Sequence, residues 1–180
     1  MDAYEIVSLY NQTLDLCDTL DNSGLGVYAL TDGGHRTRET LRLELSQFLL
    51  YLGNANASFE DGEVALMNIV LGEEYTASTY EQLCASVDEP SPDKSLTLIG
   101  FISGDKALNN KNGTRATQLC DLLVNLYENM GNVMVALDDN KVATLRKIKF
   151  INNRLLYIIV FSVISNGKNR SYNNITVRIS

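Results

Sequence analysis

The sequence predicts an all-α fold: a helical bundle built from two duplicated helix–turn–helix units, with an irregular C-terminal tail. Apolar residues recur at intervals of three and four along most of the first 150 residues, which is the spacing of amphipathic helices. No strand-like alternation of any length appears before the tail. One stretch of the chain also aligns with a second stretch 78 residues later. With 180 residues, 45% of them hydrophobic, the chain can bury one sizeable core.

The N-terminal element is expected to be a helix beginning at Asp2, which forms a D-x-x-E capping box with Glu5. Residues 21–34 are a glycine-rich connection, and their GLG lacks the lysine that a phosphate-binding loop needs. A second helix is expected from Thr37. The apolar stripes of the two helices are Ile6, Leu9, Tyr10, Leu14, Cys17 and Leu20, then Leu41, Leu45, Phe48, Leu52 and Ala55.

The later elements follow from turn signals and helical periodicity. The segment DEPSPD, residues 88–93, contains both prolines of the chain and is the best candidate linker. The last residues, NNITVRIS at 173–180, are a candidate short strand. The helices expected here are one from about Glu63 after a turn at 59–62, a short one from Ser78 to about Ser86, one over roughly 94–107, and a long one from Arg115 to about Leu137.

The internal repeat aligns LGNANASFEDGEVALMNIV, residues 52–70, with MGNVMVALDDNKVATLRKI, residues 130–148. The apolar stripe of the preceding helix also matches position by position. We therefore expect two units, near 37–71 and 115–149, within a helical domain spanning residues 1–150. The aligned turn and glycine positions are Gly53 with Gly131, Glu60 with Asp138, Asp61 with Asp139, and Gly62 with Asn140.

The acidic pairs of the two turns, Glu60 with Asp61 and Asp138 with Asp139, admit two interpretations. Acids beside the N-terminus of the following helix are favourable there, which is a purely structural role. Carboxylates are also ligands for hard divalent cations. An EF-hand is excluded, because taking Gly62 as the sixth loop residue places Ala57 and Phe59 at ligand positions.

The segments LYLGNANASFEDGEV and YENMGNVMVALDDNKV resemble the signature of TerB-like domains, a family named after the tellurite-resistance protein TerB. The resemblance covers roughly residues 36–150. It implies an all-helical bacterial protein with duplicated units, a part in tellurite resistance and stress response, and action in membrane-associated or multi-protein complexes. It also implies that acidic residues bind a divalent cation.

When the TerB-like signature is aligned with the two segments, its acidic position falls on Asp61 and Asp139. The downstream glutamate of the signature is replaced by Asn68 in the first unit and by Arg146 in the second. The positive charge of Arg146 would repel a bound cation. The metal site that the resemblance implies, for Ca²⁺, Mg²⁺ or Zn²⁺, consists of Glu60, Asp61, Asp138 and Asp139.

Charge is distributed unevenly along the chain. Residues 1–140 hold all 22 acidic residues and 7 of the 15 basic ones, whereas residues 141–180 hold 8 basic residues and no acid. The acidic body disfavours binding to nucleic acid. Residues 151–180 are expected to form a basic tail, which is either an interaction arm or a non-native end produced by a lost reading frame.

The apolar run of this tail, LLYIIVFSVI at 155–164, is half the length that a membrane-spanning helix needs. A lost reading frame predicts that the run packs poorly against the helical core. Full burial against the helices at 41–58 and 119–137 would instead make the tail part of the fold.

Three further groups of residues are expected to be structural. His35 is placed in an exposed loop. The odd number of cysteines, without CxxC spacing, favours packed thiols in a reducing cytoplasm over a disulfide framework. A small basic face is expected to form ion pairs with Glu39 and Glu44. The cysteines are Cys17, Cys84 and Cys120, and the basic face consists of Arg36, Arg38 and Arg42.

Three functions stay open on the sequence alone. The first is a cytoplasmic interaction or regulatory module with protein partners, working within a larger assembly; it needs no nucleic acid and no transmembrane segment, and it leaves membrane association open. The second is a divalent-cation-binding stress protein that uses the acidic turns. The third is an enzyme with a carboxylate pair; because no nucleophile accompanies the acids, we expect no enzyme.

Overall fold

The computed structural model describes residues 3–54, 59–137 and 141–159. Within these ranges the chain is helical and contains no strand, which confirms the predicted all-α class. The strand expected at 173–180 lies outside the described residues. The helices are α1 (Ala3–Asn22), α2 (Val27–Leu30), α3 (Thr37–Gly53), α4 (Asp61–Leu71), α5 (Ala77–Cys84), the 3-10 turn η1 (Pro92–Lys94), α6 (Leu96–Asn112), α7 (Gln118–Leu137) and α8 (Lys141–Ile159).

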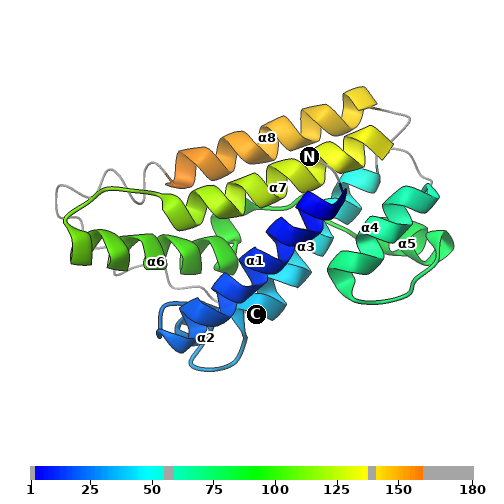
Figure 1. Ribbon diagram of the computed structural model, residues 1–180. Helices are drawn as coiled ribbons and strands as arrows, with labels where there is room; N and C mark the ends of the chain where they lie inside the picture. The colour runs from blue at the N-terminus through cyan, green and yellow to red at the C-terminus, as the bar shows by residue number, and fades with distance from the viewer. Residues whose placement is uncertain (1–2, 55–58, 138–140, 160–180) are drawn as a thin grey trace.

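The helices form two crossed groups (Figure 1). Helices α6, α7 and α8 lie side by side with alternating directions, and α7 is in the middle. Helices α1 and α3 run antiparallel to each other and cross this layer, while α4 and α5 cover the far end of α3. The short α2 packs against α6 near the start of α3.

Helix α3 is the centre of the core because it contacts both groups. The predicted stripe is fully buried from Leu41 to Leu52, as the helical spacing predicts, whereas its last member, Ala55, lies outside the described residues. Burial of such apolar faces is the main driving force for the arrangement. Opposite it, Met130 and Met134 of α7 are also fully buried. The apolar side chains of α3 without exposed surface are Leu41, Leu45, Phe48, Leu49 and Leu52.

The two expected units correspond to helix pairs, α3 with α4 and α7 with α8. Both pairs are in contact along the chain, as a helix–turn–helix unit requires. The equivalence of their backbones stays a prediction, which a superposition of the two pairs tests.

Two glycines within helices have a packing reason. A Cβ on Gly53 would lie 2.4 Å from the ring of Phe59, so only glycine leaves room for that aromatic side chain. A Cβ on Gly131 would lie 2.9 Å from Ile148 of α8 and 3.3 Å from Phe48 of α3. Each glycine therefore makes room for a large side chain of a neighbouring segment.

Several helix boundaries differ from the expected ones. Helix α5 is capped by Thr76, whose hydroxyl accepts from the Thr79 N–H at 3.4 Å, so Ser78 is inside the helix. Helix α6 continues to Asn112 because Gly113 supplies the left-handed C-cap, at φ 66°. Helix α2 has no counterpart in the expected elements, since four residues are too few for a periodicity signal. The capping box at Asp2 lies outside the described residues.

Carboxylates of other helices, two of them buried and that of Glu44 half-buried, accept N–H groups at three helix starts. Asp21 of α1 accepts from the Thr37 N–H of α3 at 2.9 Å. Glu44 of α3 accepts from the Leu96 N–H of α6 at 2.9 Å. Asp105 of α6 accepts from two N–H groups of α7, those of Leu119 at 3.0 Å and Cys120 at 2.9 Å.

Helix α8 crosses the expected domain boundary at residue 150 and ends at Ile159. Ile151, Leu155 and Ile159 are buried in the same core as α3 and α7, so residues 151–159 belong to the fold. The poor packing expected after a lost reading frame is therefore wrong for this part of the tail. Residues 160–180, including the rest of the apolar run, lie outside the described residues.

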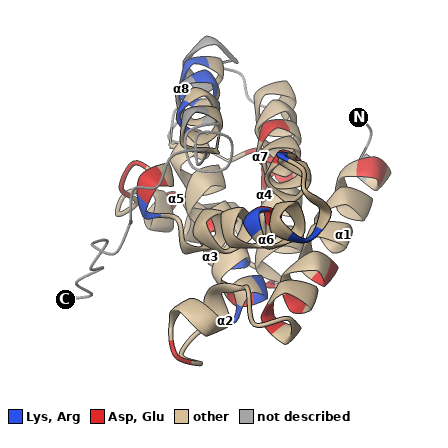
Figure 2. Cartoon of the chain, turned by 90° about the vertical axis from the view of Figure 1, so that its left-hand side faces the viewer, with Lys and Arg blue, Asp and Glu red and all other residues tan. Residues whose placement is uncertain are grey.

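Basic side chains gather on α8, whereas acidic ones are spread over the other helices (Figure 2). Arg146 and Lys149 are exposed on α8. Lys147 is instead held against α3, where its ammonium donates to the Tyr51 carbonyl at 2.7 Å and lies 4.2 Å from the centre of the Tyr51 ring. No helix in the described part of the chain is both long enough and apolar enough to cross a membrane.

Candidate functional site

The first acidic pair of the predicted metal site begins α4. Glu60 is the N-cap of the helix and forms a capping box with Glu63; the Glu60 N–H donates to the Glu63 carboxylate at 3.0 Å. Asp61, the first helical residue, is exposed. The geometry gives this pair the helix-capping role that a negative charge at a helix N-terminus favours.

The second acidic pair, Asp138 and Asp139, lies outside the described residues, so the joint site stays a prediction. In the ranges that the structure does cover, no three His, Cys, Asp or Glu side chains come together to hold a metal ion. Asn68, which replaces the downstream glutamate of the signature, accepts from the Tyr80 hydroxyl at 2.6 Å and the Tyr75 N–H at 2.9 Å. Asn68 thereby ties α4 to α5.

The small basic face predicted on α3 does not pair with Glu39 and Glu44. Arg38 forms ion pairs with Asp15 at 3.1 Å and Asp18 at 2.6 Å on α1. Arg42 donates to the carbonyls of Val70 at 3.2 Å and Leu71 at 2.6 Å, which closes the C-terminus of α4. These arginines face neighbouring helices because α3 is central, which a linear reading of the sequence does not show.

Histidine and the cysteines are where the sequence predicts them. His35 is exposed, and Cys17, Cys84 and Cys120 are buried free thiols. Burial raises the pKa of the Cys17 thiol to about 12 and that of Cys84 to about 11, so neither is a thiolate at neutral pH.

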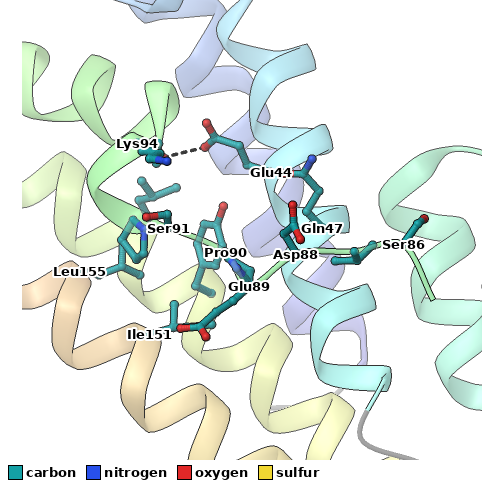
Figure 3. Close-up of a pocket in the computed structure, with 15 residues that line it drawn as sticks. Glu44, Gln47, Ser86, Asp88, Glu89, Pro90, Ser91, Lys94, Ile151 and Leu155 are labelled. Atoms are coloured by element: carbon teal, nitrogen blue, oxygen red, sulfur yellow. Dashed lines mark hydrogen bonds between the residues drawn. The ribbon is translucent and has the colours of Figure 1, made fainter. Parts of the chain in front are cut away.

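A cleft of about 570 Å³ opens between α3, the segment 86–95, α7 and α8. Its polar residues come from α3 and the connecting segment, and its apolar residues come largely from α7 and α8. Figure 3 shows Asp88, Glu89 and Pro90 along the segment, with Glu44 on one side of it and Ile151 on the other.

The floor of the cleft is apolar. Leu123 and Tyr127 of α7 and Ile151 and Leu155 of α8 line it, and all four are buried core residues. The Tyr127 ring also packs against Phe48 of α3, with ring centroids 5.1 Å apart. Burial and the nearby Glu44 raise the pKa of the Tyr127 hydroxyl, which keeps it neutral. Helix packing thus holds the floor rigidly.

The wall of the cleft is fixed at both ends. Before the segment, the Cys84 thiol donates to the Leu50 carbonyl of α3 at 3.1 Å. At its far end, Asp93 of η1 forms an ion pair with Arg154 of α8 at 2.6 Å. Between them, Pro90 and Pro92 restrict the backbone, so little conformational entropy remains for a ligand to remove.

Glu44 is the most perturbed carboxylate of the cleft. Burial raises its pKa above the ordinary value, although hydrogen bonds from Ser95 and the α6 backbone oppose the shift. The Ser95 hydroxyl donates to Glu44 at 2.7 Å and the Leu96 N–H donates at 2.9 Å. Asp88 and Glu89 are exposed at the rim, as is Lys94.

The cleft is the site that sequence reasoning missed. The two prolines of residues 88–93 indicate a linker, but nothing in the sequence of this segment shows which helices it lies against. The chain matches no protein-family model, no curated protein and no solved structure. The relationship to TerB-like domains therefore stays a prediction that rests on the two sequence segments.

Proposed function

We propose that this chain is a helical protein-interaction module that takes a segment of a partner protein into the cleft between α3, the segment 86–95, α7 and α8. One observation carries the proposal: a cleft of about 570 Å³ has a rigid apolar floor and a polar wall that the fold already holds in place. Concave sites with apolar linings and a few oriented polar groups are where proteins usually bind small molecules, and a single side chain of a partner segment is of the same size.

The proposal assigns binding, and no chemical step, to the cleft. The three buried thiols suit a reducing compartment, so we propose that the module works in the cytoplasm. A TerB-like role in a stress-response assembly is compatible with a binding module. The alternative, a cation-binding protein that uses the acidic turns, has no supporting observation at Glu60 and Asp61, whose geometry is that of a helix cap.

A display experiment tests the proposal. The full chain is immobilised and challenged with a random peptide library, and enriched peptides are re-measured by fluorescence anisotropy. Gln47→Trp fills the cleft from an exposed position on α3. Gln82→Trp makes the same change at an exposed position on α5 that does not line the cleft.

We expect the wild type and Gln82→Trp to bind the same peptides, and Gln47→Trp to lose them at least tenfold, about 1.4 kcal/mol. Circular dichroism on each variant checks that the fold is kept. Two results contradict the proposal: a library that yields no binder for the wild type, or binders that Gln47→Trp retains in full.

A further inference from the structure

The charges of the cleft select the kind of segment that can enter it. Three carboxylates, those of Glu44, Asp88 and Glu89, line it against one ammonium, that of Lys94. The surplus of negative charge repels an acidic segment, and a neutral segment offers no charged group to pair with the carboxylates of the rim. A cationic group on the ligand is the complementary choice.

The floor adds a second requirement. Below the carboxylates lie the apolar side chains of Leu123, Ile151 and Leu155 and the ring of Tyr127. A small cation such as ammonium or a metal ion would leave this surface uncovered. A long aliphatic stem that ends in a charged head satisfies both the floor and the rim, because such side chains bury the stem and keep the head polar.

Glu44 provides the innermost charge. Its hydrogen-bond partners are a serine hydroxyl and backbone N–H groups, which orient the carboxylate without neutralising it. A carboxylate accepts about four hydrogen bonds, and Glu44 already accepts three, one at Oε2 and two at Oε1, so Oε2 can take a further donor. The N-terminus of α6 holds the group in place, and a ligand would find it already positioned.

Resting on the proposed function, we infer that the cleft recognises an arginine or lysine side chain from a basic segment of a partner protein. The stem lies on the floor of α7 and α8, and the charged head contacts Glu44 and the rim acids. Arginine binds more tightly than lysine, because its planar fork engages carboxylates in pairs and stacks on aromatic rings. The specificity of the module is therefore for positively charged sequences.

The test is an NMR titration of the ¹⁵N-labelled full chain with N-acetyl-arginine methylamide. The matched neutral probe is N-acetyl-citrulline methylamide, which has the same stem and shape without the charge. We expect the arginine probe to shift the backbone amides of Val87, Asp88, Ser91 and Ser95, with an affinity about tenfold above that of citrulline.

Two charge-matched double variants locate the effect. Asp88→Asn with Glu89→Gln removes the rim acids, and Glu73→Gln with Glu74→Gln removes an equally exposed adjacent pair outside the cleft. The first should weaken binding of the arginine probe about tenfold, and the second by less than about twofold, because exposed charges that do not line the cleft act on the probe only through screened, long-range attraction.

The outcomes separate this inference from the proposed function. Selected peptides that occupy the cleft without arginine or lysine, together with equal binding of arginine and citrulline, overturn the inference and leave the interaction module standing. Equal losses in the two double variants overturn it as well, because they show general attraction to an acidic surface. A library without binders and a chain that neither probe shifts overturn both.

Discussion

Replacement of Asp105 by alanine tests the capping of one helix by another. Asp105 is 1% exposed on α6, and its carboxylate accepts the N–H groups of Leu119 at 3.0 Å and Cys120 at 2.9 Å in the first turn of α7. Alanine removes both hydrogen bonds. It also leaves the N–H of the fully buried Cys120 without its acceptor.

The expected loss follows from these two bonds. A hydrogen bond to a charged acceptor contributes about 1.5–3 kcal/mol, so the pair contributes about 3–6 kcal/mol. Alanine recovers about 0.5 kcal/mol of helix propensity, and the carboxylate no longer needs to be desolvated. We expect a net loss of about 3 kcal/mol, which for a chain of this length lowers the melting temperature by about 6–12 °C.

Urea unfolding monitored by circular dichroism at 222 nm measures the loss. The control is Asp121→Ala, the same truncation in the first turn of α7, at an exposed carboxylate whose partner is the Thr117 hydroxyl at 3.0 Å. We expect it to cost less than about 1 kcal/mol, because exposed charges at helix ends contribute little. Equal losses in the two variants would refute the capping argument.

Three further predictions test other parts of the fold by the same measurement. Leu155→Ala should lower the free energy of unfolding by about 2–5 kcal/mol, because this side chain is buried. The neighbouring Leu156→Ala, at a side chain 46% exposed, should change it by less than about 0.5 kcal/mol. Similar values for the two variants would contradict the packing of α8 in the core. Gly53→Ala should lower stability by about 1–3 kcal/mol, because the added Cβ meets the Phe59 ring; a stabilised variant would contradict that contact. Burial raises the folded-state pKa of Glu44 above its ordinary 4.5, so protonation of this group favours the native state, and its contribution to stability falls as the pH rises from about 4.5 through the folded pKa. Glu44→Gln should show a shallower fall over that window, and an unchanged slope would refute the desolvation argument.

Helical periodicity predicted the fold class and most of the core, because burial of one face leaves a pattern along each helix. The stripe of α3, from Leu41 to Leu52, is buried as expected. The role of Glu60 at the start of a helix followed from the acidic turn, although the capping partner Glu63 did not. These are local relationships, which a sequence expresses directly.

The cleft and the ion pairs were not predictable in the same way. Arg38 is closer in sequence to Glu39 and Glu44 than to Asp18, its partner across α1 and α3. Glu44 acts on a helix start 52 residues later. Such pairs depend on the order in which helices pack, and a single sequence holds no signal for that order.

Helix starts that are completed by other helices limit how this chain can be divided. Glu44, in the first of the two expected units, caps α6, which lies between the units, and Asp105 of α6 caps α7, in the second. Asp21 in turn secures the start of α3 from α1. If the chain were cut after α5, the part that contains α6 would lack Glu44, the cap of α6. A fragment that began at α7 would lack Asp105, the cap of α7. Even if the two units descend from one ancestral copy, we expect that neither folds as an autonomous building block once these caps are separated from the helices they complete.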